Sequence, residues 1–257
     1  MKRRFDSKIA AGDLQDQQER LVYGLQPVRE AIASHGANVR VLVEDRREAT
    51  PQLDAIERFA KDRGAKVRRA ARGEMDQLTH NGRHQGAIAF APPLRILRIE
   101  DLELGDEALV VVLDSIEDPQ NFGAVIRSSV AFGATAVVWP EHGAAPLTPA
   151  TFRASAGAVE HARLCTVPSL PAAIETLKAR GLRIIGLDSN ANEPLASEDL
   201  AAPIALVLGA EGAGLHKAVK KSCDALARLP MRGPLASLNV SAAAAIALYE
   251  AIRQREN

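Results

Sequence analysis

Three polar, glycine-containing segments hold most of the residues that could take part in chemistry. The first is residues 113–123, LDSIEDPQNFG, and Arg127 follows it four positions later. The second is residues 208–215, LGAEGAGL, and the third is residues 229–241, LPMRGPLASLNVS. Glycines let a ligand approach the backbone closely, and an arginine carries a permanent positive charge. These segments could therefore hold a nucleotide-like ligand beside a cation.

Each segment taken alone also has a purely structural explanation. Asn121 could cap a helix, and Ser237 with Asn239 could cap the last helix of the chain. Residues 209–214 could be a strand-to-helix turn. A dinucleotide-binding loop is disfavoured, because neither the G-x-G-x-x-G order nor a Gly-Lys-Ser/Thr phosphate loop is present. Considered singly, the segments leave both interpretations open.

The second half of the chain has the pattern of a parallel α/β sheet. Residues 108–113 are a continuous apolar run, which is typical of a strand buried on both faces. Further strands are expected at 136–139, 183–187 and 204–208, and helices at 122–132, 171–180 and 238–253. This alternation favours a mostly parallel sheet covered by helices on both faces. In such a sheet, ligands bind beyond the carboxyl ends of the strands, where the three polar segments fall.

The first part of the chain predicts a small αβ domain over residues 20–92. Helices are expected at 27–34 and 51–63, strands at 39–43, 66–69 and 85–90, and a short helix from Gly73. Pro27 suits the first turn of its helix, where the missing N–H costs nothing. Residues 1–19 are polar and predict a flexible arm, and residues 93–105, which begin with a proline, predict a linker. The larger domain is then 106–257.

Composition and charge are those of an ordinary globular protein, with 47% apolar and 25% charged residues. The net charge of zero conceals an asymmetry, because residues 1–95 contain 18 Lys and Arg against 13 Asp and Glu, whereas the remainder contains 14 against 19. A basic first part suits contact with phosphates. Aromatic residues make up only 4%, which disfavours base recognition by rows of stacked aromatic rings.

Several classes of protein are disfavoured by what the sequence lacks. The two cysteines, Cys165 and Cys223, have neither zinc-site nor disulfide spacing, and no His/Cys/carboxylate cluster predicts a metal. His142 and His161 belong to no motif and are expected to be structural. No apolar run approaches the ~20 residues needed to span a bilayer, and the first residues are polar. We therefore expect a cytoplasmic protein that contains no metal and does not enter a membrane.

Together and in this order, the three segments resemble the motifs of the SpoU family of RNA ribose 2′-O-methyltransferases, also called the TrmH family. Residues 118–123 match D-P-x-N-x-G, residues 209–214 match G-x-E-x-x-G, and residues 230–241 match P-M-x-G-x-x-x-S-L-N-V-S. Residues 22–32 resemble the opening of the ribosomal-protein-like RNA-binding domain of many members, and residues 84–86 its close. The resemblance covers about residues 21–253.

The resemblance implies a fold, a cofactor and an assembly. The fold is α/β, with a C-terminal SPOUT-type parallel-sheet methyltransferase domain tied in a trefoil knot and a small N-terminal αβ domain that binds RNA. The cofactor is S-adenosylmethionine, and the residues expected to contact it are Leu208, Gly209, Gly214, Leu229, Met231 and Leu238. Family members are homodimers whose active site is shared between protomers.

The resemblance also assigns roles in methyl transfer, where the 2′-hydroxyl must lose a proton as its oxygen approaches the methyl group. Arg127 is placed beside the forming alkoxide. We favour electrostatic stabilisation there, because arginine is almost always protonated, although mechanisms for the family also write it as the base. Asn121 is expected to hold the ribose or orient Arg127, and Glu211 to position both. Ser237 and Asn239 are expected to shape a third wall.

The implied substrate is ribosomal RNA, most closely a guanosine of 23S RNA, because transfer-RNA members usually lack the N-terminal domain. Arg153 occupies a position where the family commonly has a basic residue, and is expected to clamp an RNA phosphate. The alternatives are a transfer-RNA ribose methyltransferase, an rRNA methyltransferase that confers antibiotic resistance, a non-catalytic RNA-binding ribosome assembly factor, and a nicotinamide-dependent oxidoreductase. The intact motif residues disfavour the assembly factor.

Overall fold

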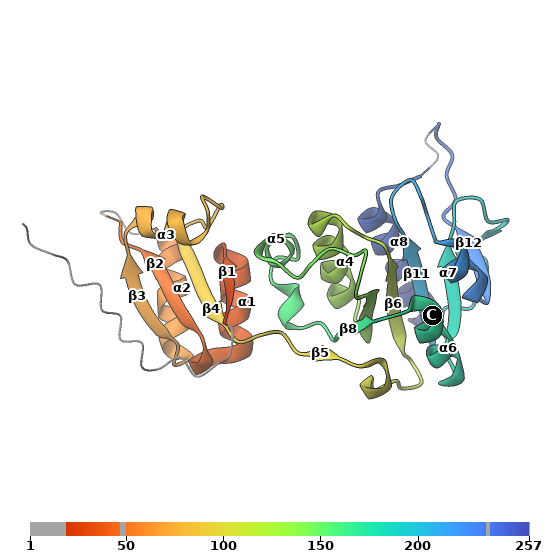
Figure 1. Ribbon diagram of the computed structural model, residues 1–257, viewed down its shortest axis with the longest axis horizontal. Helices are drawn as coiled ribbons and strands as arrows, with labels where there is room; N and C mark the ends of the chain where they lie inside the picture. The colour runs from red at the N-terminus through yellow and green to blue at the C-terminus, as the bar shows by residue number, and fades with distance from the viewer. Residues whose placement is uncertain (1–18, 47–49, 235–236, 257) are drawn as a thin grey trace, which may run out of the picture.

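The computed structural model describes residues 19–46, 50–234 and 237–256, which are arranged in two adjoining bodies (Figure 1). The first body is built on a four-stranded sheet and the second on an eight-stranded sheet. The arm expected over residues 1–19 falls, apart from Glu19, outside the described residues. Within the described ranges, no helix is long and apolar enough to cross a membrane.

The N-terminal body has helices on both faces of its sheet. Its elements are β1 (Arg20–Tyr23), α1 (Leu25–His35), the 3-10 helix η1 (Gly36–Asn38), β2 (Arg40–Glu44), α2 (Pro51–Asp62), β3 (Lys66–Ala70), α3 (Arg72–Leu78) and β4 (Ala87–Ala91). The strand order is β1-β4-β2-β3, in which only β2 and β3 run parallel. Side chains alternate along a strand. Val41 and Val43 accordingly join the core that includes α1 and α2, whereas Leu42 packs with Met75 of α3.

The C-terminal body contains an eight-stranded sheet in which every strand pair is parallel. Its strands are β5 (Ile96–Leu97), β6 (Leu109–Asp114), β7 (Ala136–Pro140), β8 (Leu164–Val167), β9 (Arg183–Leu187), β10 (Glu193–Pro194), β11 (Ile204–Gly209) and β12 (Ala225–Arg228). Their order is β10-β12-β9-β11-β6-β7-β8-β5. The expected mostly parallel α/β sheet is therefore confirmed.

Helices cover both faces of this sheet. They are α4 (Pro119–Ala131), α5 (Pro149–Ala154), α6 (Leu170–Ala179), α7 (Lys217–Ser222) and α8 (Val240–Arg255), with the 3-10 helices η2 (Ile99–Asp101), η3 (Ala158–Glu160) and η4 (Leu195–Ser197). Val111 of the central strand β6 belongs to the core cluster with α4 and α8, whereas Val112 belongs to the one with α6 and α7. All six residues of β6 are buried, as its continuous apolar run predicts.

The shortest elements were not expected from the sequence. The helices α5 and α7 and the strands β8 and β12 have only four to six residues each, which is too short to show a clear hydrophobic period. The segment 93–105, expected to be a linker, contains β5, which pairs with β8 at the edge of the large sheet. This chain segment therefore both connects the bodies and extends the second sheet.

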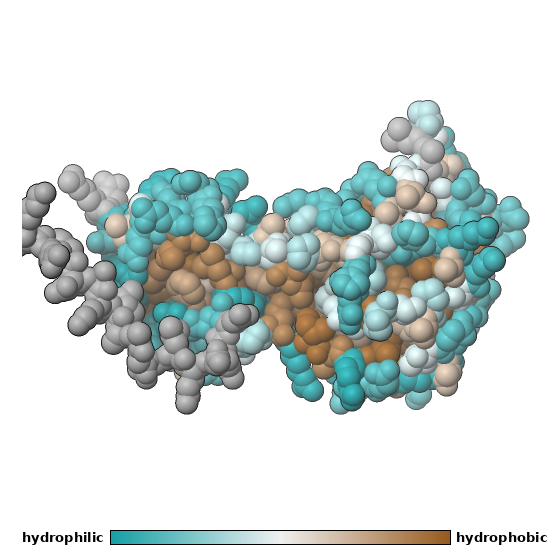
Figure 2. Space-filling model, in the orientation of Figure 1, coloured by the Kyte–Doolittle hydropathy of each residue, from teal (hydrophilic) through white to brown (hydrophobic). Residues whose placement is uncertain are grey.

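The two bodies are joined by a polar cluster centred on Glu160 of η3. Arg20 of β1 donates from Nη1 and Nη2 to the two oxygens of Glu160 at 2.7 and 2.5 Å, and Nε2 of His35 lies 3.0 Å from Oε2. The Glu160 side chain is only 1% exposed. Nearby, the guanidinium of Arg153 lies over the ring of Tyr23. A Cβ at Gly157, beside η3, would lie 2.7 Å from Cβ of Glu30 in α1, so the two bodies pack closely here. Figure 2 shows apolar surface around the same junction.

Candidate functional site

The three polar segments meet at one edge of the large sheet. β6 and β11 are parallel neighbours, and Gly209 is in register with Asp114 at their carboxyl ends. β12, which leads into the third segment, is separated from β11 only by β9. The expectation that these segments lie beyond the carboxyl ends of parallel strands is confirmed, and chemistry at this edge can draw on all three.

The first segment leaves the side chain of Asn121 free to act. Asp118 is the N-cap of α4, accepting hydrogen bonds from the backbone N–H groups of Gln120 and Asn121 at 3.1 and 3.2 Å. Pro119 occupies the first turn, where no N–H is needed. Because Asp118 caps the helix, the capping interpretation of Asn121 is wrong. Its carboxamide points toward the third segment, where it accepts a hydrogen bond.

Asn239 connects all three segments while capping α8. Its Oδ1 accepts from the backbone N–H of Ser241 at 2.9 Å, which is the expected N-cap contact. Its Nδ2 donates to Oδ1 of Asn121 at 2.9 Å and to Oε2 of Glu211 at 3.3 Å. The capping interpretation of Asn239 is therefore confirmed, while its expected role as a wall of the active site stays a prediction, and Asn239 does not line the cavity described below. One residue from each segment contributes to a single polar cluster.

Arg127, which follows the first segment on α4, and Ser237, which belongs to the third segment, do not join the cluster. Arg127 lies on α4 and is exposed, and it forms no hydrogen bond or ion pair with any residue in the described ranges. Ser237 lines the adjoining cavity, but no hydrogen bond joins its side chain to the described residues. An exposed, unpaired guanidinium can reach a bound polyanion. Of the five expected catalytic residues, the structure thus brings together Asn121, Glu211 and Asn239.

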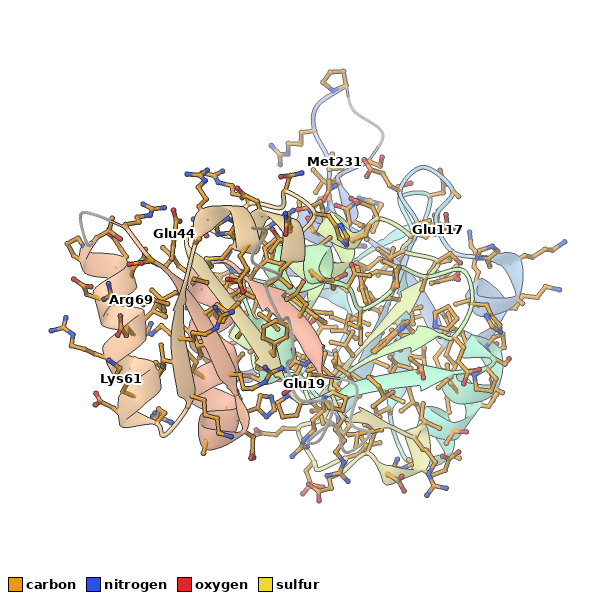
Figure 3. All side chains as sticks on the ribbon, turned by 60° about the vertical axis from the view of Figure 1, so that its left-hand side comes forward. Glu19, Glu44, Lys61, Arg69, Glu117 and Met231 are labelled. Carbon is orange, nitrogen blue, oxygen red and sulfur yellow. The ribbon has the colours of Figure 1, made fainter. Side chains whose placement is uncertain are left out.

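A cavity of about 350 Å³ opens between the second and third segments. All six residues expected to contact the cofactor line it: Leu208, Gly209, Gly214, Leu229, Met231 and Leu238. Met231 is labelled in Figure 3, at the base of the projecting third segment. The volume lies in the range of small-molecule sites, about 300–1,000 Å³. The cavity walls combine glycine backbone with leucine side chains, so they can hold a partly apolar ligand against backbone polar groups.

Gly209 is required by the way the second segment folds back on itself. Gly214 donates its backbone N–H to the carbonyl oxygen of Ala210 at 2.8 Å. A Cβ at Gly209 would lie 2.2 Å from the carbonyl carbon of Gly214, closer than any real contact. Gly212 and Gly214 have φ values of +78° and +68°, which favour glycine. The glycines therefore give this loop a tight fold that forms one wall of the cavity.

Two features of the site were missed by the sequence analysis. Asp188 and Asn190 line the cavity directly after β9, and Lys220 holds the carboxylate of Asp188. That hydrogen bond is the main cause of the lowered pKa of Asp188. The position of residues 188–190, immediately after an expected strand, was the signal that could have identified them.

The second missed feature is a contact that fixes the second segment to β6. Asp114 is 3% exposed and accepts the backbone N–H of His216 at 2.7 Å, while Nδ1 of the same histidine lies 2.9 Å from its other oxygen. Ser115 has a φ of +60°, an uncommon value for a residue with a side chain. The buried carboxylate thus holds the strand end and the loop together.

The remaining titratable groups give no sign of metal or thiol chemistry in the part of the chain that the structure describes. No group of three or more His, Cys, Asp or Glu side chains there could hold a metal ion. Cys165 and Cys223 are free, and burial raises the pKa of each thiol to about 11. A thiol with that pKa is protonated, and therefore a poor nucleophile, at neutral pH.

Comparison with known proteins identifies relatives across both bodies. Residues 108–249 match the model of the SpoU rRNA Methylase family, and residues 21–97 match that of the RNA 2′-O ribose methyltransferase substrate-binding domain. A 23S rRNA (guanosine-2′-O-)-methyltransferase, RlmB, of Pseudomonas putida is 35% identical over 91% of this chain and 96% of its own length.

Solved structures agree with the sequence comparison. An RNA 2′-O ribose methyltransferase superposes with a TM-score of 0.80 at 30% identity, covering 94% of this chain and 90% of the other. The SpoU methyltransferase AviRb from Streptomyces viridochromogenes, in complex with the cofactor AdoMet, gives a TM-score of 0.77 at 28% identity, with 93% and 91% covered. The chain that brings Asn121, Glu211 and Asn239 together beside this cavity therefore belongs to the SpoU family of RNA ribose methyltransferases.

Proposed function

We propose that the protein methylates the 2′-hydroxyl of a ribose in ribosomal RNA, specifically a guanosine of 23S RNA, with S-adenosylmethionine as methyl donor. The observation that carries the proposal is the junction of Asn121, Glu211 and Asn239 beside a cavity of about 350 Å³. RNA methylation follows from family membership. The choice of a 23S guanosine rests on relatives that bear that name and align over nearly their whole length.

The cavity is suited to the cofactor in size and in the chemistry of its walls. Leu208, Leu229 and Leu238 would contact the apolar parts of the nucleoside, while the closely folded backbone of residues 209–214 would contact its polar edges. Asp188 and Asn190 also line the cavity and add side-chain acceptors. When bound, S-adenosylmethionine supplies an electrophilic methyl group on a positively charged sulfur.

The chain's own residues would orient the ribose and stabilise the oxygen that is losing its proton. Asn239 holds Asn121 and Glu211 in fixed positions, which preorganises the cluster without a rearrangement at the moment of reaction. Arg127, with no partner among the described residues, would place its charge beside the developing alkoxide. We assign the proton to a phosphate oxygen or a water, because guanidinium does not release its own.

The N-terminal body would deliver the RNA. Its sequence matches a model for substrate binding over residues 21–97, and residues 1–95 hold the basic excess of the chain. We propose domain limits of 20–92 and 106–257, joined by 93–105. Arg153 would clamp a phosphate from its place at the junction, with its guanidinium held over the ring of Tyr23 at 5.6 Å.

The assembly would be a cytoplasmic homodimer of knotted C-terminal domains. Support comes from the family, and from α8, where Ile246 and Tyr249 are 45% and 57% exposed although both are large and apolar. Exposed apolar groups of this kind are common at interfaces between subunits. Light scattering at micromolar concentration should give twice the mass of one chain. A stable monomer would exclude the dimer.

The test of function is to map ribose methylation by mass spectrometry in RNA from a strain that lacks the gene. Loss of one 2′-O-methylguanosine from 23S RNA, restored by the wild-type gene, is the expected result. Loss of a methyl group from transfer RNA would identify the alternative substrate instead. Unchanged methylation of all RNA, with defective ribosome assembly, would favour the non-catalytic assembly factor.

A further inference from the structure

A second cavity, of about 350 Å³, lies in the N-terminal body and shares no residue with the first. It is located where the parallel strands β2 and β3 end, the edge of a sheet at which ligands commonly bind. Its walls are Glu44, Arg46, Arg72, Asp76 and residues 81–86. All of them belong to the segment that matches a substrate-binding domain.

Glu44 places a carboxylate in the wall of this cavity, and its position in the body can be followed in Figure 3. Its side chain is 5% exposed, and its Oε2 accepts from Nη2 of Arg46 at 2.8 Å. Every buried side-chain oxygen in the described ranges has a hydrogen-bond partner. No described residue donates to Oε1 of Glu44, so Oε1 is not one of the buried atoms. It is therefore open to the cavity. An ionised carboxylate only accepts hydrogen bonds, so this atom selects a donor.

The wall beside Glu44 is rigid. Gly86 donates its backbone N–H to Nδ1 of His84 at 3.0 Å, which leaves Nε2 as the protonated nitrogen, and Nε2 lies 2.9 Å from Oδ1 of Asp76. Both ring nitrogens of this 4%-exposed histidine are thus used. Gly86 has a φ of +83°, and a Cβ there would lie 2.8 Å from Leu53 and 3.2 Å from Oε2 of Glu44. The backbone N–H of Glu44 donates to the carbonyl oxygen of Gly86 at 2.9 Å, so the end of β2 and this loop are joined before any ligand binds.

Arginines supply the complementary charge. Arg46, Arg72 and Arg83 line the cavity against two carboxylates, those of Glu44 and Asp76, so the cavity carries a net positive charge. Arg83 is exposed and has no hydrogen-bond or ion-pair partner among the residues that the structure describes. A cation of this kind is available for a phosphate, and its planar group can also stack on a base.

We propose that this cavity binds one unstacked nucleotide of the RNA substrate and prefers guanine. The proposal rests on the proposed function, since it takes RNA as the substrate. Guanine carries two adjacent N–H donors, N1–H and N2–H, on its Watson–Crick edge, whereas adenine, cytosine and uracil have no two adjacent donors there. Single-stranded bases are recognised through that edge when they are splayed out of a loop or bulge. Glu44 would accept one guanine donor at Oε1 and the other at the remaining lone pair of Oε2, which also accepts from Arg46. Arg83 would bind the neighbouring phosphate.

The test measures binding of the full chain to four RNA hairpins that differ only in one bulged nucleotide, G, A, C or U. Wild type is expected to bind the bulged-G hairpin about tenfold more tightly than the others, the scale of one bidentate base contact. E44Q replaces one acceptor by a donor and should remove the preference. Arg83→Ala should weaken all four hairpins and reduce the slope of log Kd against log salt by about 0.9.

Each of the two variants has a control that removes a charge of the same sign elsewhere on the N-terminal body. Arg58→Ala and Asp62→Asn change exposed residues of α2 that do not line the cavity. They should preserve the guanine preference and bind within about twofold of wild type. Circular dichroism checks that each variant is folded, and because Arg83 is exposed its variant tests the cavity even if E44Q does not fold.

Equal affinity of wild type for the four hairpins would overturn the proposal, as would a preference for G that survives in folded E44Q. A salt slope for Arg83→Ala equal to that of Arg58→Ala would overturn the phosphate contact. Methylation of 23S RNA by wild type, measured in parallel, separates the two ideas. If methylation occurs and the preference is absent, the cavity proposal fails while the proposed function stands.

Discussion

Asn239 donates a hydrogen bond of 2.9 Å to Asn121, a residue 118 positions earlier in the chain. The same carboxamide caps α8 through its oxygen and contacts Glu211 through its nitrogen. The folding of the last helix and the arrangement of the polar cluster therefore depend on one side chain. Its two functions can be separated, because they use different atoms.

Asn239→Asp should retain the cap and lose the cluster. The aspartate oxygen can still accept from the N–H of Ser241, but it cannot donate to Asn121, and it adds a charge beside Glu211. We expect near wild-type stability with a loss of methyl transfer of about 10²-fold, the cost of a small displacement of reacting groups. Asn239→Ala should lose similar activity and also about 1 kcal/mol of stability. Urea unfolding and single-turnover rates measure the two effects, and a fully active Asn239→Asp enzyme would contradict the assigned contact.

Gly209→Ala should impair cofactor binding by displacing the folded loop. Its Cβ would meet the backbone of Gly214 at 2.2 Å, so the loop must move away. We expect the Kd for S-adenosylmethionine, measured by calorimetric titration, to rise at least about tenfold, which corresponds to about 1.4 kcal/mol. Gly105→Ala is the control, since nothing lies within 4 Å of a Cβ at that position. Unchanged cofactor affinity in Gly209→Ala would show that this loop does not form the cofactor site.

The sequence predicted the long, strongly patterned elements better than the short ones. β6 could be recognised because an apolar run of six residues is long enough to indicate a fully buried strand. β12, ALAR, has only four residues and shows no such pattern, and it pairs with β9 and the short β10. Its place in the sheet depends on partners far away in the chain, which a local pattern does not contain.

The candidate site shows the same division. The motifs located Asn121, Glu211 and Asn239 in three separate segments, but their mutual hydrogen bonds depend on the parallel register of β6 with β11. The cap of α4 shows what local sequence cannot decide. Both Asp118 and Asn121 are good capping residues, and only the observed backbone gives the cap to Asp118. The cavity around Glu44 is likewise formed by three segments that share no motif.

Glu160→Gln should weaken the junction between the two bodies. The carboxylate is 1% exposed and binds Arg20 with both oxygens, so removing its charge leaves a nearly buried guanidinium poorly paired. Breaking such a pair costs about 3–5 kcal/mol. Urea unfolding should show this loss, or a separate early transition of the N-terminal body. Glu30→Gln, which removes the more exposed pair with His161, is expected to cost no more than about 1 kcal/mol.

The two buried thiols should make the protein less stable at alkaline pH. Burial raises the pKa of Cys165 and Cys223 to about 11, whereas an unfolded cysteine has a pKa of about 8.5. The unfolded chain therefore releases these protons first, and the free energy of unfolding should fall as pH rises from about 8.5 toward about 11. Urea unfolding between pH 7 and 10.5 should show a shallower decline for the Cys165→Ala, Cys223→Ala double variant. Parallel curves for the two proteins would contradict the raised pKa values.

Arg127→Ala should abolish methyl transfer while leaving the affinity for S-adenosylmethionine almost unchanged, because Arg127 does not line the cavity. Loss of one preorganised charge at a developing oxyanion costs on the order of 10²–10³ in rate. Arg127→Lys keeps the charge but loses the planar fork, and should recover part of the activity at all pH values. If residue 127 instead acts as the general base, its side chain must first lose a proton. Lysine loses its proton more easily than arginine, so the activity of Arg127→Lys would then approach that of the wild type as pH rises. Single-turnover rates between pH 6 and 10 distinguish the two roles. A fully active Arg127→Ala enzyme would exclude both, and would leave Asn121, Glu211 and Asn239 to orient the ribose without a cation from this helix.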